Sequence, residues 1–295
     1  VVVCAAIVGV LSFLLLTRRL RHMTDIVRRF RQGDWGQRVQ PRDADELGEL
    51  GAAFDQMADT IVDNVDQLKE VDRQRREMVA NISHDLRSPL TSVQGYIETI
   101  LLRESDLSND QRRQYLETVS QSVRFLNRLV NQLFELSKLE SGQSQPATEV
   151  FSIEELVHDV TAKYQPLADQ KQVSLTASKP QALRHVRADI SMIERTLDNL
   201  IENALRFTPP EGQISIELQQ DEGDVLIDVT DTGAGIPADE LPHIFDRFYR
   251  VRRHPDGTGL GLAISQRILE AHERSISVKS RVDEGSVFSF SLPCA

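Results

Sequence analysis

The segment NISHDLRSPL, residues 81–90, places a histidine, an acid and a proline inside what otherwise reads as one long amphipathic helix. Apolar residues recur through and around it at intervals of three and four, the spacing of a core-facing helical stripe. This stripe consists of Val79, Ile82, Leu86, Leu90, Val93, Ile97 and Ile100. His84 lies about 200° around the helix from its nearest stripe residues, so we expect it on the surface beside Asp85, with Ser88 one turn further along. Pro89 removes the hydrogen bond to the carbonyl of Asp85, and we expect it to kink the helix.

A second amphipathic helix follows after a short loop. Ser108 and Gln111 fit a capping box at its start. Its apolar stripe consists of Leu116, Val119, Val123, Leu126, Val130 and Leu133. The two helices predict an antiparallel hairpin, and one hairpin cannot bury both stripes well. Two hairpins can bury all of them in a four-helix bundle, so the pattern predicts a homodimer.

The chain begins with an apolar segment, residues 1–16, in which Ser12 is the only polar residue, and a basic segment, TRRLR, follows it. We interpret residues 1–16 as a transmembrane helix truncated at its N-terminal end, because buried soluble helices are rarely apolar on every face. A buried soluble helix is the alternative. The basic segment places the rest of the chain on the cytoplasmic side. Residues 17–63 then read as two helices joined by a connector, the first ending near Gly33 and the second beginning near residues 43–46.

Composition narrows the classes of protein that fit. The length of 295 residues suits two or three modules. A formal net charge of −11 does not suit a nucleic-acid-binding protein. The two cysteines, Cys4 and Cys294, provide neither a disulfide framework nor a cysteine-rich metal site.

The second half of the chain, residues 150–295, reads as alternating strands and helices. A helix over residues 190–207 carries Asn199 and Asn203 on one side, with Arg206 one turn further on. Two strands follow, and the second leads directly into DTGAGIP, residues 231–237. Next come IFDRFYR at 244–250, GTGLGLAI at 257–264 and a final hairpin.

These segments carry groups suited to a nucleotide. Asp231, at a strand end, can accept a hydrogen bond from the exocyclic amine of adenine, and glycines at 233 and 235 let the backbone approach the base. The side-chain oxygen of Asn203 is a hard neutral ligand for Mg²⁺. Glycines at 257, 259 and 261 open a helix and can turn backbone N–H groups toward phosphate. A surface histidine such as His84 is largely neutral near pH 7 and can attack an electrophile, with Asp85 fixing its tautomer.

Taken together, these motifs resemble those of the membrane sensor histidine kinases of two-component systems. NISHDLRSPL resembles the H box of that family, DNLIENALRFTPP (198–210) its N box, DTGAGIP its G1 box, IFDRFYR its F box and GTGLGLAI its G2 box. The resemblance implies that His84 is the phosphoacceptor and Asp85 its acid/base partner. Ser88 is a third implied catalytic position. It stands where family members that also dephosphorylate their partner usually have Thr or Asn, so the resemblance leaves a reverse phosphatase activity open.

The resemblance also implies a set of nucleotide contacts and a metal ligand. Asn203 would bind Mg²⁺, and the residues that contact ATP or pack its lid would be Asn199, Asn203, Arg206, Phe207, Asp231, Gly233, Gly235, Ile236, Phe245, Arg247, Phe248, Gly257, Thr258, Gly259, Leu260, Gly261 and Leu262.

The implied fold is multidomain. A membrane span (1–16) would lead to a HAMP module (17–63), a dimerisation and phosphoacceptor hairpin that forms a four-helix bundle (64–142), a linker (143–149) and an α/β sandwich ATP-binding domain of the GHKL (Bergerat) type (150–295). The implied function is ATP-dependent autophosphorylation of His84, followed by transfer to an aspartate of a response regulator. The implied location is the bacterial inner membrane, with the catalytic part in the cytoplasm.

Three other functions remain as alternatives. A plain ATPase of the gyrase class would need a glutamate four residues before Asn203 to activate water, and this chain has Asn199 there. A catalytically inactive signalling scaffold would not need the full set of motifs. A Ser/Thr kinase would carry H-R-D and D-F-G motifs, which this sequence lacks.

Overall fold

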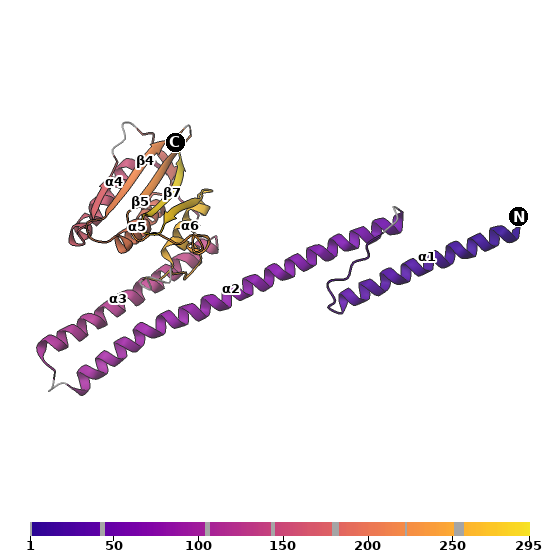
Figure 1. The fold of residues 1–295 in the computed structure, drawn as a ribbon, viewed down its shortest axis with the longest axis horizontal. Coiled ribbons are helices and arrows are strands. Elements are labelled where there is room, and N and C mark those ends of the chain that lie inside the picture. The colour runs from indigo at the N-terminus through magenta and orange to yellow at the C-terminus, as the bar shows by residue number, and fades with distance from the viewer. Residues whose placement is uncertain are drawn as a thin grey trace. The chain divides into compact units, whose positions relative to one another are not determined.

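The computed structural model describes residues 2–41, 45–103, 107–142, 145–178, 183–221, 223–250 and 257–295, apart from the side chains of residues 5, 74, 75, 77 and 78. The chain divides into two compact units, residues 1–80 and residues 81–295. Helix α2 (Glu46–Leu102) passes through the boundary between them (Figure 1). Residues 43 and 44 of the predicted helix start, and residues 143 and 144 of the predicted linker, lie outside the described residues.

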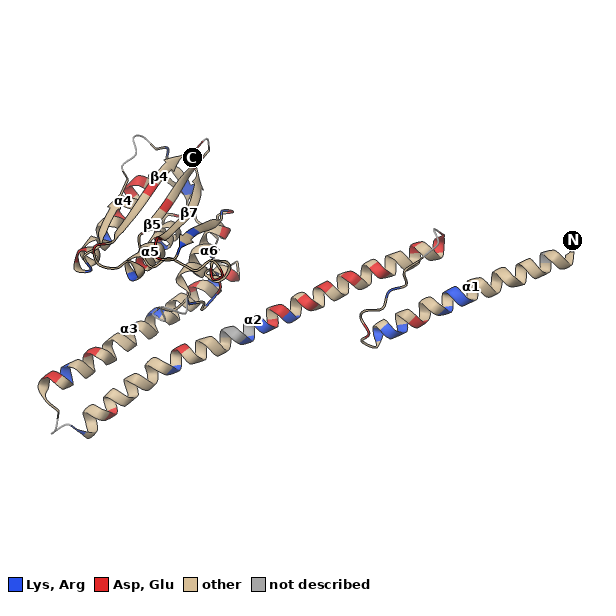
Figure 2. Ribbon diagram, in the orientation of Figure 1, with Lys and Arg blue, Asp and Glu red and all other residues tan. Residues whose placement is uncertain are grey.

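The first unit opens with helix α1 (Val2–Arg31). The predicted span and the first of the two helices after it form one continuous helix, since no helix-breaking residue separates them. Its N-terminal half carries no charge (Figure 2), and among the described residues it is the one helix long and apolar enough to cross a membrane, judged by length and composition. The helix ends where predicted, just before Gly33, which has a φ of 101°.

Carboxylates hold the connector between α1 and α2. The Asp55 carboxylate accepts hydrogen bonds from the backbone N–H groups of Val39, at 2.7 Å, and Gln40, at 2.9 Å. Asp45 pairs with Arg19 of α1, at 2.6 Å, and accepts a hydrogen bond from the backbone N–H of residue 48. The Arg19 hydrogen bond is the main reason that the pKa of Asp45 lies below its usual value. These contacts fix the path of the connector along both helices.

The hairpin pairs the second half of α2 with α3 (Asn109–Glu140). The predicted capping box is confirmed: the Ser108 hydroxyl accepts from the Gln111 N–H at 3.2 Å, and the Gln111 side chain accepts from the Ser108 N–H at 3.0 Å. Helix α2 continues through Pro89, so the proline does not end it. Residues of the two predicted stripes, including Leu90 and Val130, are exposed in the single chain. The hairpin therefore leaves apolar surface for another helix pair to cover.

The C-terminal part is a mixed sheet covered by helices (Figure 1). Its strands are β1 (Glu149–Phe151), β2 (Ser174–Ala177), β3 (Val186–Ala188), β4 (Gln213–Gln220), β5 (Asp224–Asp231), β6 (Ile276–Arg281) and β7 (Gly285–Pro293). Its helices are α4 (Ile153–Gln170), α5 (Ile190–Phe207), the 3-10 turn η1 (Leu241–His243) and α6 (Gly261–Ala271). The main sheet has the order β2-β4-β5-β7-β6, with β2 parallel to β4 and the other pairs antiparallel. Strands β1 and β3 form a separate antiparallel pair.

The core lies between this sheet and helices α4 and α5. Burial alternates along β5, as expected for a strand with one face against helices. Leu197 and Ile201 of α5 are fully buried, as are Ile214 and Ile216 of β4. This two-layer packing confirms the predicted α/β sandwich. It also places the C-terminal end of α5 near the end of β5, where the predicted nucleotide-binding residues lie.

Candidate functional site

A cavity of about 460 Å³ lies where α3, α5, β5 and the glycine-rich segment before α6 meet. The predicted site residues that line it are Asn199, Asn203, Arg206, Phe207, Asp231, Gly235, Ile236, Gly257, Thr258, Gly259, Gly261 and Leu262. Segments up to about sixty residues apart in the C-terminal half thus contribute to one cavity.

Asp231, the last residue of β5, is a buried carboxylate in the cavity wall. Its side chain is 7% exposed, and Oδ1 accepts a hydrogen bond from the backbone N–H of Gly233 at 2.8 Å. Burial raises the pKa of Asp231 above its usual value, while backbone hydrogen bonds from Gly233 and Ser286 oppose that rise. A buried acceptor held in place by the backbone is suited to recognising a fixed donor on a ligand.

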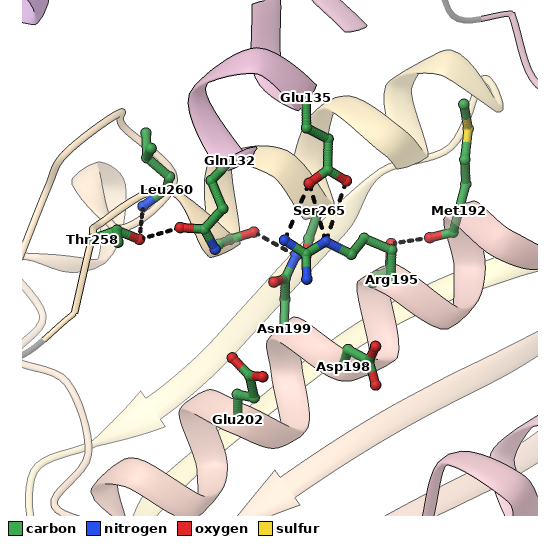
Figure 3. A network of polar contacts seen from close by, with 12 residues as sticks. Gln132, Glu135, Met192, Arg195, Asp198, Asn199, Glu202, Thr258, Leu260 and Ser265 are labelled. Carbon is green, nitrogen blue, oxygen red and sulfur yellow. Dashed lines mark hydrogen bonds and ion pairs between the residues drawn. The ribbon is translucent and has the colours of Figure 1, made fainter. Parts of the chain in front are cut away.

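The two asparagines of α5 lie in different surroundings. Asn199 is 3% exposed, and its amide nitrogen donates to the carbonyl of Gly261 at 3.1 Å and to the hydroxyl of Ser265 at 3.2 Å (Figure 3). It therefore ties α5 to α6. Asn203, one turn later, is half-buried and lines the cavity, and its side chain forms no hydrogen bond within the part of the chain that the structure describes. Of the two, Asn203 offers its oxygen to a ligand more directly.

Three contacts shape the glycine-rich segment. Gly257 has a φ of 114°, and a Cβ on it would lie 2.3 Å from the guanidinium of Arg206. The carbonyl of Gly259 accepts a hydrogen bond from the backbone N–H of Phe248 at 2.9 Å. The hydroxyl of Thr258 donates to the side-chain oxygen of Gln132 at 2.7 Å. Helix α6 begins directly afterwards, so its first N–H groups and this segment face the same region.

The phosphoacceptor candidate lies on the hairpin. The His84 side chain is 83% exposed, which confirms the predicted surface position, and its Nδ1 lies 3.3 Å from Oδ1 of Asp85. Asp85 is only 12% exposed, because its other oxygen forms an ion pair with Arg250, the residue that ends the IFDRFYR segment. Ser88, one turn further along, is exposed.

Some predicted contacts do not line the cavity. These residues are Gly233, Phe245, Arg247, Phe248 and Leu260. Arg247 pairs instead with Glu140 of α3 at 2.5 Å, and Phe248 and Leu260 are buried behind the cavity wall. Gly235 lines the cavity, but a Cβ on it would lie 1.8 Å from the carbonyl oxygen of Arg281, so packing within the chain requires a glycine there.

Sequence reasoning missed a whole wall of the cavity. Phe125, Arg128 and Gln132 of α3 line it, together with Tyr249 and Arg250. The three α3 residues are spaced three and four apart and lie off the apolar stripe. That spacing predicts a shared helix face, but nothing in the sequence distinguishes this face from one exposed to solvent.

Three family models match the chain. The model described as histidine kinase-, DNA gyrase B-, and HSP90-like ATPase matches residues 188–295. The His Kinase A (phospho-acceptor) domain matches residues 74–142, and the HAMP domain matches residues 14–63. The three models follow one another from residue 14 to residue 295, with gaps at 64–73 and 143–187.

Several sensor proteins and solved histidine kinases are similar to the chain. The chain is 29% identical to the heme sensor protein HssS of Staphylococcus haemolyticus (strain JCSC1435), over 94% of this chain and 58% of HssS. It is 34% identical to the sensor protein SrrB of Staphylococcus aureus (strain N315), over 76% of this chain and 39% of SrrB. The solved structure of the Acinetobacter baumannii histidine kinase AdeS superposes with a TM-score of 0.59 and 25% identity, over 72% of this chain and 98% of AdeS. The chain thus spans roughly 58% and 39% of the length of the two curated relatives.

Proposed function

The chain belongs to the sensor histidine kinases, and from this we propose that it transfers the γ-phosphoryl group of ATP to His84 and then to an aspartate of a separate response regulator. One observation carries the proposal. An imidazole that is 83% exposed lies beside a carboxylate on the hairpin, and the F-box segment that borders the nucleotide cavity contacts that same carboxylate through Arg250.

The chemistry follows from this arrangement. When Nδ1 of His84 carries the proton, it faces Oδ1 of Asp85 at 3.3 Å and leaves the Nε2 lone pair outward. Nε2 forms a bond to the γ-phosphorus as the bond to the β,γ-bridging oxygen breaks and ADP leaves. The Asp85 carboxylate stabilises the positive charge that develops on the ring and accepts the Nδ1 proton. Arg250 holds the other oxygen of Asp85 and so orients the carboxylate.

ATP would be held by residues at both ends of the cavity. Asp231 would accept a hydrogen bond from the adenine amine, and the N–H groups around Gly257 and Gly261 would donate to the phosphates. The described residues contain no group of three or more His, Cys, Asp or Glu side chains that could hold a metal ion. Asn203 offers one hard oxygen, which fits Mg²⁺ because this ion commonly keeps waters and takes its other ligands from phosphates. Bound there, Mg²⁺ would neutralise phosphate charge.

The assembly and location belong to the same proposal. The exposed stripes of α2 and α3 pair with those of a second copy in a four-helix bundle. Helix α1 anchors the protein in the bacterial inner membrane, with the hairpin and ATP-binding domain in the cytoplasm. The domains would be a span at 1–16, a HAMP module at 17–63, the phosphoacceptor hairpin at 64–142, a linker at 143–149 and the ATP-binding domain at 150–295.

Labelling with γ-labelled ATP tests the proposal, and the chain offers a matched control. We expect an acid-labile, alkali-stable label on the native protein that is lost in His84→Gln. His158 is also exposed, at 71%, and is also followed by an aspartate, with Nδ1 3.8 Å from Oδ1 of Asp159. The variant His158→Gln should keep the label. Equal labelling of the native chain and His84→Gln, or ATP turnover with no phosphorylated intermediate, would overturn the proposal and favour a plain ATPase.

A further inference from the structure

We propose that Arg128, on helix α3 of the hairpin, binds the phosphates of the nucleotide, so that the site is shared between the hairpin and the ATP-binding domain. The inference deepens the proposed function and rests on ATP as the ligand of the cavity. It assigns a phosphate contact outside residues 188–295, which match the ATPase family model.

The first argument is the face of α3 on which Arg128 lies. Phe125, Arg128 and Gln132 all line the cavity, and their spacing of three and four places them on one side of the helix. This side is distinct from the apolar stripe, which includes Leu126, Val130 and Leu133. Arg128 can therefore contact a ligand in the cavity while a second copy of the hairpin covers the stripe.

The second argument is the hydrogen bond made by Gln132, which lies one turn after Arg128 on α3. Gln132 is 4% exposed, and its side-chain oxygen accepts the hydroxyl hydrogen of Thr258 at 2.7 Å (Figure 3). The Thr258 oxygen in turn lies 3.4 Å from the backbone N–H of Leu260. Because residues four apart on a helix have Cβ atoms about 5–6 Å apart, this bond places Arg128 within one side-chain length of the glycine-rich segment.

A second polar contact fixes the same side of the helix, three residues further on. Arg195 of α5 pairs with Glu135 of α3, with Nε 3.1 Å and 3.2 Å from the two carboxylate oxygens (Figure 3). Together, the Gln132 and Glu135 contacts fix the rotation of α3 about its axis and its position along that axis relative to the ATP-binding domain. The position of Arg128 at the cavity therefore follows from two independent contacts.

The third argument is charge. Within the described part of the chain, Arg128 forms no ion pair and no hydrogen bond, whereas Arg250, also at the cavity, is paired with Asp85. A triphosphate requires counter-charges, and a guanidinium can donate two parallel hydrogen bonds to one phosphate. The carboxylates that line the cavity are Asp231, assigned to adenine, and Glu202, which accepts from the hydroxyl of Tyr164 at 3.1 Å.

Binding measurements on the full-length chain test the inference. His84→Gln provides a background without turnover, and Arg128→Gln is added to it. We expect Arg128→Gln to weaken ATP binding roughly tenfold or more, the size of a lost charge-assisted hydrogen bond, and to leave the affinity for adenosine unchanged. Arg128→Lys keeps the charge without the planar group, so its affinity for ATP should lie between those of the His84→Gln background and Arg128→Gln.

The matched control is Arg124, one turn earlier on α3. It is exposed, does not line the cavity, and its guanidinium donates to Ser120 at 2.8 Å, so Arg124→Gln should leave both affinities unchanged. Unchanged ATP binding in Arg128→Gln, or an equal loss of ATP and adenosine binding, would overturn the inference. The labelling experiment on His84 is separate, so failure of phosphoryl transfer would be distinguishable from failure of this contact.

Discussion

Replacing Asp231 by Asn separates two effects of this carboxylate. One is its effect on the stability of the nucleotide-free protein, and the other is its contribution to nucleotide binding. The substitution keeps the size of the side chain and removes its charge. Asp231 is 7% exposed, and burial raises its pKa above the usual value. A buried carboxylate with a raised pKa destabilises the nucleotide-free fold at neutral pH, and we expect nucleotide binding to offset that loss of stability.

The effect on stability has a definite sign. Because the pKa of Asp231 is higher in the folded than in the unfolded chain, the folded chain binds more protons. The stabilisation of the fold that comes from protonating Asp231 is therefore complete below the pKa of the unfolded chain, about 3.9. It is lost as pH rises through the pKa of the folded chain. At pH 7, Asp231→Asn should therefore leave the melting temperature of the nucleotide-free protein unchanged or raise it. Any increase in melting temperature of Asp231→Asn over the native chain should become smaller as pH falls toward about 4.

The effect on binding is opposite and larger. Losing a hydrogen bond to a charged acceptor costs about 1.5–3 kcal/mol, or roughly 10- to 150-fold in Kd. At an ATP concentration of about 100 times the native Kd, ligand stabilisation is about 2.7 kcal/mol. A variant bound about 100-fold more weakly would keep only about 0.4 kcal/mol at the same concentration. The rise in melting temperature caused by ATP should therefore nearly disappear.

Differential scanning fluorimetry with and without ATP measures both effects on one sample. Asp239, which follows the same DTGAGIP segment but is exposed and outside the cavity, provides a control, and Asp239→Asn should keep the ATP-induced shift. A lower melting temperature for empty Asp231→Asn combined with a full ATP-induced shift would refute the reasoning, because it would show a structural carboxylate with no role in binding.

Three further substitutions test the packing around the site. Ser265→Ala removes a buried acceptor of the Asn199 amide and should lower the free energy of unfolding in urea by about 1–3 kcal/mol; no change would show that the contact is dispensable. Leu197→Ala, in the fully buried core of α5, should cost about 2–5 kcal/mol in the same assay, and a loss below about 1 kcal/mol would contradict that packing. Gln132→Ala should speed amide exchange of the segment around Thr258, and unchanged exchange would show that α3 does not hold it.

The sequence predicted those features whose signals are local. The capping box joins Ser108 to Gln111, three residues apart, and the outward position of His84 follows from helical spacing over a few residues. The nucleotide motifs were recognised for the same reason, since each is a short segment with its own turn or helix start.

Features that depend on packing between distant segments could not be predicted from local patterns. Thr258 and Gln132 are 126 residues apart, so no local pattern shows that α3 forms a wall of the cavity. Arg247 was predicted to contact the nucleotide, and no local pattern indicates its ion pair with Glu140 of α3. Gly235 was predicted to let the backbone approach a ligand, and no local pattern shows that the carbonyl of Arg281 also leaves no room for a side chain there.

Helix α3 carries an apolar stripe on one face and forms a wall of the cavity with another, so a movement of the helix affects both. A helix moves as a rigid element, so repacking the stripe that contains Val130 also displaces Gln132 and Arg128. The bond from Thr258 to Gln132 is 2.7 Å long, and a shift of about 1 Å takes it beyond hydrogen-bonding range. Small movements of α3 within the proposed bundle would therefore change the cavity directly. Because coupling is reciprocal, a nucleotide that binds one arrangement of α3 more tightly must in turn favour the bundle packing that goes with it.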